Sequence, residues 1–155
     1  IADSSMEIIV PTIYKLAKDK LDVLMDFMME KGLENFWKFS VANAVAQIAF
    51  LESDRKPEVI AWFKDLLAAI NRDFPTATYT DAVLNGSIVS DLIDIDAAEL
   101  LPEIKTMYDN GFVDLLSCGD FAEVEKAIIG KEHSPSPEIK PDIKERYDLL
   151  RKFVE

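Results

Sequence analysis

The sequence predicts an all-α protein, an α-α superhelix of helix pairs followed by a Pro-rich linker and a C-terminal helix. Three observations indicate this fold class: apolar residues recur at helical spacing, helix-capping patterns precede several of these runs, and a two-helix unit recurs along the chain. With 155 residues, of which 49% are hydrophobic, the chain can bury one core. We expect the helical domain at residues 1–130 and the linker with its helix at 131–155.

The first two helices are expected over residues 5–17, with Pro11 inside, and over 19–31. The second carries an apolar stripe at spacings of three and four residues, and Gly32 is placed to end it. The stripe consists of Leu21, Leu24, Met25, Met28 and Met29.

The next helix, over 36–50, is the most apolar part of the chain, but it is shorter than the roughly 20 apolar residues that a membrane-spanning helix needs. We therefore expect no membrane segment, and we expect this helix to be apolar all round because it lies between two neighbours. Its polar residues Asn43 and Gln47 are expected at helix ends or at edges where their hydrogen bonds are satisfied. An amphipathic helix should follow, with Pro57 near its start.

The segment 76–96 allows two interpretations. Asn85-Gly86 between β-rich residues is typical of a hairpin turn. However, Ala82, Val83, Val89 and Ile93 share one helical face with Gly86. We favour a helix, in which the glycine lets a neighbouring helix approach closely.

Capping patterns predict three further helix starts. Asp96 with Glu99, and Asp120 with Glu123, each place an acceptor at the N-cap and a glutamate three residues later. A third such pattern begins at Asp142. Helices are therefore expected to begin near residues 97, 121 and 142, the last after the Pro-rich linker "GKEHSPSPEIKP".

Residues 36–73 and 77–111 repeat one arrangement, in which a helix rich in small residues precedes an amphipathic helix. Four positions of the second helix recur at an offset of 41 residues, which lies within the range of HEAT and armadillo repeats. The chain resembles a bacterial family of HEAT-like domains of unknown function, sometimes found upstream of a SEC-C zinc module. The resemblance covers roughly residues 3–129 and is carried by "FWKFSVANAVAQIA", "KPEVIAWFKDLL" and "DLIDIDAAELLPEIKTMYDNGFVDLLSCGDFAEVEKAI". It implies a helical-repeat fold and no catalytic residue, and the zinc-binding cysteines of the SEC-C module are absent from this sequence.

We expect no catalytic residue, no cofactor and no metal site. The chain has one Cys and one His, fewer than a zinc site or a Cys-His catalytic pair placed on a rigid scaffold would need. We expect Cys118 to be a buried or inert thiol and His133 to be a solvated linker residue. Asp91, Asp94 and Asp96 lack the spacing and the glycine of a calcium loop.

Charge gives the more informative signal. The chain has 29 acidic and 17 basic residues, and residues 76–125 contain eleven acids and the single base Lys105. This balance argues against nucleic-acid binding. Capping and solvated helix faces explain part of the acidity, and the alternative is a docking surface for a basic protein. The candidate contacts in this region are Asp91, Asp94, Glu99 and Glu103.

Trp62 and Asp65 are further candidates for partner binding, because they lie beside the apolar stripe of the 57–73 helix rather than within it. Trp62 either covers a neighbouring helix or projects from the surface, where tryptophan is a common interface residue. The first alternative is favoured.

We expect a protein-interaction or scaffold module that presents a helical-repeat surface to a protein partner, with no enzymatic activity of its own. The alternative is a fragment of an enzyme, or of a protein with a metal module, whose active residues lie outside this chain. A single cysteine and an N-terminus without a basic signal-peptide region favour the cytoplasm. The sequence does not predict an oligomeric state.

Overall fold

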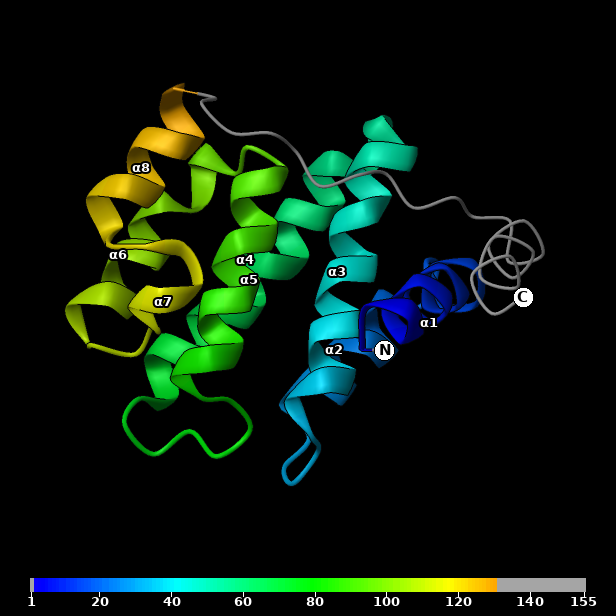
Figure 1. Ribbon diagram of the computed structural model, residues 1–155, viewed down its shortest axis with the longest axis horizontal. Coiled ribbons are helices and arrows are strands. Elements are labelled where there is room, and N and C mark those ends of the chain that lie inside the picture. The colour runs from blue at the N-terminus through cyan, green and yellow to red at the C-terminus, as the bar shows by residue number, and fades with distance from the viewer. Residues whose placement is uncertain (1, 131–155) are drawn as a thin grey trace.

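The computed structural model describes residues 2–130, and this part of the chain contains helices and no strand (Figure 1). The all-α prediction is therefore confirmed. Short 3-10 turns, η1 (Ser53–Arg55) and η2 (Ala98–Leu100), lead directly into α4 and α6. The α-helices are α1 (Ala2–Ala17), α2 (Leu21–Met29), α3 (Asn35–Leu51), α4 (Lys56–Asp73), α5 (Ala82–Asp94), α6 (Leu101–Asp109), α7 (Leu115–Cys118) and α8 (Phe121–Gly130).

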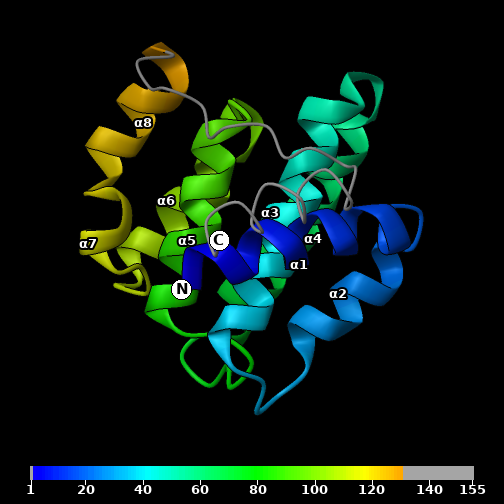
Figure 2. The ribbon, with the colours of Figure 1, turned by 45° about the vertical axis from the view of Figure 1, so that its right-hand side comes forward.

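The helices form two layers (Figures 1 and 2). In one layer α3 packs between α1 and α5, and in the other α4 packs between α2 and α6. Helices α3 and α5 run in the same direction: Asn35 at the start of α3 donates to Asp81 before α5 (2.9 Å), and Asn43, two turns later, donates to Asp91 (3.1 Å).

The core is centred on α3, which contacts α1, α2, α4 and α5. From Val41 to Ala49 every side chain except that of Asn43 is buried, and the alanines at 42, 44 and 46 are at most 2% exposed. Small side chains allow the neighbouring backbones to approach. The expectation that this helix lies between two neighbours is therefore confirmed for its middle turns.

Polar side chains inside α3 are hydrogen-bonded rather than placed at the helix ends. Asn43 and Gln47 both lie in the middle of the helix rather than at its ends. Asn43 donates to Asp91, which agrees with the second alternative, a position where its hydrogen bonds are satisfied. Lys38 is 1% exposed, and its ammonium donates to the carbonyls of Glu30 and Tyr79 at 2.6 Å each. Through these two hydrogen bonds, Lys38 connects α3 with the end of α2 and with the loop before α5.

Residues 82–94 form the helix α5 rather than a hairpin, as predicted. Gly86 lies where α7 crosses α5: a Cβ at this position would lie 2.6 Å from the Cβ of Ser117 and 3.3 Å from the carbonyl of Asp114. The expected close approach of a neighbouring helix at this glycine is confirmed.

Of the two capping boxes within residues 2–130, one is present. Asp120 accepts from the amide of Glu123, and Glu123 accepts from the amide of Asp120, both at 2.9 Å. The prediction of a capping box at Asp96 and Glu99 was wrong. Asp96 has a positive φ of 53° and follows the C-terminus of α5, where the amide of Ala97 donates to the carbonyl of Leu92. This left-handed position ends a helix, whereas an N-cap requires extended backbone.

The Pro-rich linker, His133 and the helix expected after Asp142 lie outside the described residues. In the part that is described, no helix is both long enough and apolar enough to cross a lipid bilayer.

Candidate functional site

Asp91 is a buried residue rather than a surface contact, which corrects one of the candidates. It is 5% exposed, and Asn43 donates to its Oδ1 at 3.1 Å, while its Oδ2 has no hydrogen-bond partner. Removal from water is the main cause that raises the pKa of Asp91 from 3.8 to about 8, with Asp94 adding to the shift and the Asn43 hydrogen bond opposing it. A buried carboxyl whose pKa is raised in this way is mostly protonated at neutral pH and is out of reach of a basic partner.

Trp62 also lies in the core, which confirms the favoured alternative that it covers a neighbouring helix. It is 6% exposed, and its indole N–H donates to the carbonyl of Leu21 at 2.9 Å. Its ring packs edge-on against Phe63. Because Leu21 begins α2, this residue joins α2 to α4.

The remaining acidic candidates do not form one open face. Glu103 is half-buried and lies 4.0 Å from the ammonium of Lys64 on α4. Asp94 is half-buried at the end of α5, while Glu99 is exposed in η2. Other acids of this region act locally: Asp81, Asp114 and Asp120 cap helices, and Asp109 pairs with Lys105. Capping and solvated helix faces therefore account for much of the negative charge.

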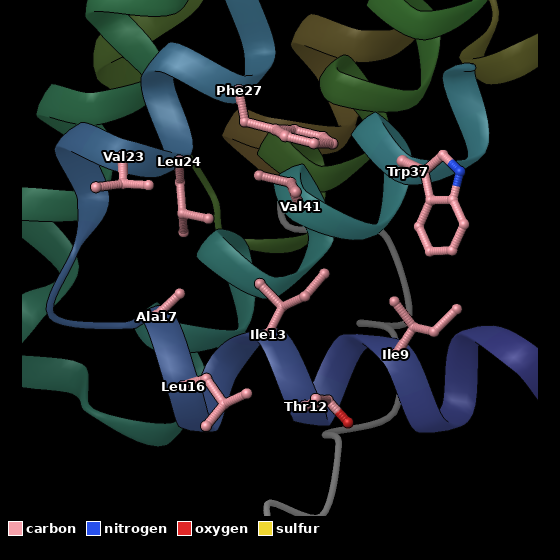
Figure 3. A pocket seen from close by; sticks show the side chains of 10 residues that line it. All are labelled: Ile9, Thr12, Ile13, Leu16, Ala17, Val23, Leu24, Phe27, Trp37 and Val41. Carbon is pink, nitrogen blue, oxygen red and sulfur yellow. The ribbon is translucent and has the colours of Figure 1, made fainter. Parts of the chain in front are cut away.

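The most apolar depression described lies at the other end of the molecule, between α1, α2 and the first turns of α3 (Figure 3). We call it the apolar groove, and its volume is about 340 Å³. In Figure 3 Ile13 and Ala17 on α1 point toward Leu24 on α2, and Trp37 closes one end. The groove is lined by Ile9, Thr12, Ile13, Leu16, Ala17, Val23, Leu24, Phe27, Trp37 and Val41.

Several large apolar side chains of the groove are exposed to an unusual extent. Leu16 is 71% exposed, Val23 56% and Trp37 45%. The one polar side chain in its lining, Thr12, already donates to the carbonyl of Ile8 in its own helix at 2.7 Å. Apart from this hydroxyl and the indole N–H of Trp37, the groove offers apolar surface without charges, which suits burial of another apolar surface.

A second groove lies on the opposite side of α2, between α2 and α4, and has a volume of about 450 Å³. We call it the acidic groove. Its floor is apolar and its edges carry carboxylates, with no basic residue in the lining. Asp65, one of the predicted contacts, lies here together with the edge of Trp62. The lining comprises Leu21, Asp22, Met25, Asp26, Glu58, Ala61, Trp62 and Asp65.

The lining of the apolar groove has no titratable side chain, whereas the acidic groove has four carboxylates. Within residues 2–130, no three His, Cys, Asp or Glu side chains converge as metal ligands. Cys118 is half-buried and lies 3.1 Å from the hydroxyl of Tyr108. Burial raises the pKa of this thiol, which reduces its thiolate fraction and agrees with the expected inert cysteine.

Sequence reasoning missed the apolar groove. Leu16, Val23 and Trp37 were not singled out, because each lies in a helix whose other apolar residues form the core stripe. A signal was present: Val23 falls outside the stripe of α2, and Trp37 lies in the first turn of α3, beyond the part that its neighbours cover.

Comparison of the chain with protein families, with curated proteins and with solved structures gives no match. The groove geometry is therefore the basis for assigning a function.

Proposed function

We propose that this chain is a HEAT-like scaffold module that binds another protein through the apolar groove. The two-layer packing supports the repeat assignment, since α1, α3 and α5 contact one another in order, as do α2, α4 and α6. Trp62 contacts Leu21, 41 residues earlier in the chain, which equals the offset of the sequence repeat. A chain of helix pairs presents its end helices and its grooves to partners.

The observation that carries the proposal is the clustering of Leu16, Val23 and Trp37 around one apolar depression. Single exposed apolar residues are common on protein surfaces, but several around a concave surface are typical of interaction sites. Burying a large apolar side chain stabilises a complex by about 1.5–3 kcal/mol. Trp37 therefore supplies the expected binding hot spot.

The shape and chemistry of the groove favour a helical segment as its occupant. Helices α1 and α2 form its two walls, with Leu16 and Val23 exposed on opposite sides. An amphipathic helix that lies in such a groove buries its apolar stripe without needing hydrogen bonds from the walls. We propose a binding role rather than a catalytic one, in the cytoplasm.

The test is affinity capture from the source cells with the full chain and two matched lysine variants. Val23→Lys places a charge in the wall of the groove, and Leu116→Lys places one at a 96% exposed site on α7. Both positions are on helix surfaces, so circular dichroism should show intact folds. We expect a protein that is captured by the wild type and by L116K but not by V23K.

Direct titration with the captured protein then measures affinity. Trp37 is exposed whereas Trp62 is buried, so partner binding should shift the emission of Trp37. Trp37→Ala should weaken binding by about 2 kcal/mol, roughly thirtyfold. Equal capture by wild type, V23K and L116K would contradict the proposal.

A further inference from the structure

The acidic groove combines an apolar floor with carboxylates on both sides. On α2, Leu21 and Met25 form part of the floor. Asp22 and Asp26 lie beside them, one helical turn apart from each other. On α4, Ala61 and Trp62 continue the floor between Glu58 and Asp65. Glu58 and Asp65 are seven residues apart, which corresponds to about 10 Å along the helix. The charged edge therefore extends over about two helical turns on α4 and about one turn on α2.

Most of this charge has no counter-ion in the described part of the chain. Glu58 is held by Arg55, whose guanidinium donates to both of its carboxylate oxygens at 2.9 and 3.0 Å. By contrast, none of Asp22, Asp26 and Asp65 forms an ion pair with another residue of 2–130, and all three are exposed. Three carboxylates therefore surround an apolar floor without neutralisation from these residues.

We propose that the acidic groove binds a basic amphipathic helix of a partner protein. An apolar residue of that helix packs on Met25, Ala61 and the edge of Trp62, and Lys or Arg residues on its two flanks meet Asp22 and Asp26 on one side and Asp65 on the other. The occupant is assigned from charge complementarity, because an apolar helix without basic flanks would leave the three carboxylates facing it.

This inference rests on the proposed role in protein binding but on a different surface. Helix α2 separates the two grooves: Val23, Leu24 and Phe27 line the apolar groove, whereas its residues 21, 22, 25 and 26 line the acidic one. Variants can therefore disable one groove and leave the other unchanged.

The probe is a synthetic amphipathic peptide made of Leu and Lys, labelled for fluorescence anisotropy, with a Leu and Glu peptide of the same pattern as its control. Wild-type protein should bind the Lys peptide and not the Glu peptide. Raising the salt from about 50 to about 300 mM should weaken binding, because exposed charges are screened within a Debye length of about 10 Å or less.

Two pairs of variants localise the binding. Ala61 and Ala68 are both exposed on α4 and lie seven residues apart, but only Ala61 lines the groove. Ala61→Arg fills the groove and neutralises its edge, so affinity should fall at least about tenfold, whereas A68R should bind as wild type does. The triple variant D22N/D26N/D65N should lose affinity similarly, while a triple with three exposed acids changed elsewhere, E34Q/E99Q/E125Q, should not.

The inference is overturned if the two triples weaken binding equally, since attraction would then come from overall charge. It is also overturned if the Lys peptide fails to bind, or if V23K abolishes binding and A61R does not, because the peptide would then occupy the apolar groove. Light scattering that detects a dimer in wild type and a monomer in A61R would instead assign the groove to a second copy of the chain.

Discussion

Replacing Asp91 with asparagine should change how the stability of the domain depends on pH. Asp91 lies between α3 and α5, where Asn43 donates to its Oδ1 and its Oδ2 has no partner. The introduced amide cannot ionise, and its oxygen can still accept the hydrogen bond from Asn43. The substitution therefore removes the titration while keeping the size of the side chain and the hydrogen bond.

The magnitude follows from the pKa of about 8 in the folded protein, against 3.8 for an aspartate in water. Between these values the folded state holds a proton that the unfolded state has released, so the free energy of unfolding falls as pH rises. At 25 °C each pH unit in this window changes it by about 1.4 kcal/mol. From pH 5 to pH 8, Asp91 should therefore lower the free energy of unfolding by about 4 kcal/mol.

Urea unfolding followed by circular dichroism at pH 5, 6, 7 and 8 tests this prediction. The wild type should lose about 4 kcal/mol more than D91N across this range. At pH 7 D91N should be the more stable protein by about 2–3 kcal/mol, because the unpartnered amide nitrogen offsets part of the gain. Asp26→Asn at an exposed site is the matched control and should follow the wild type. Parallel profiles for wild type and D91N would refute the reasoning that burial holds Asp91 protonated.

Three further substitutions test the packing and capping of the fold by urea unfolding. Gly86→Ala should destabilise by about 1–3 kcal/mol through its clash with Ser117, and adding Ser117→Gly should recover part of this loss; no loss in G86A would contradict the close contact. Lys38→Met should cost about 3 kcal/mol because two carbonyls lose their donor, whereas Lys31→Met at an exposed site should be nearly neutral. Asp120→Ala should cost about 1 kcal/mol by removing the N-cap of α8, and an unchanged stability would show that the cap is dispensable.

The candidate site was only partly accessible from sequence. Asp65 and Trp62 were found because they lie beside a stripe, and both line the acidic groove. Asp22 and Asp26, which complete the groove from α2, were not found, since the pairing of α2 with α4 is a long-range contact. Asp91 was expected at the surface because it is one of several acidic residues close together in the sequence. The sequence does not show that α3 packs against it.

Local patterns in the sequence are sufficient to predict that the chain is helical and where most helices lie. Apolar spacing, proline at a helix start and the Asp120–Glu123 box are local signals, and they act within one or two turns of backbone. The sequence also favoured a helix over a hairpin at Gly86, because four neighbours share its helical face.

Which side chains are buried and which face a groove depends on the packing of helices that are distant in sequence. Asp96 looks like an N-cap by spacing, but the end of α5 holds it at a positive φ. Trp37 belongs to the same apolar helix as Val45, yet one is 45% exposed and the other fully buried. Exposure depends on which neighbouring helices reach a given turn, and those neighbours are distant in sequence. For this reason the two grooves beside α2 follow from the packing of helices rather than from any single segment.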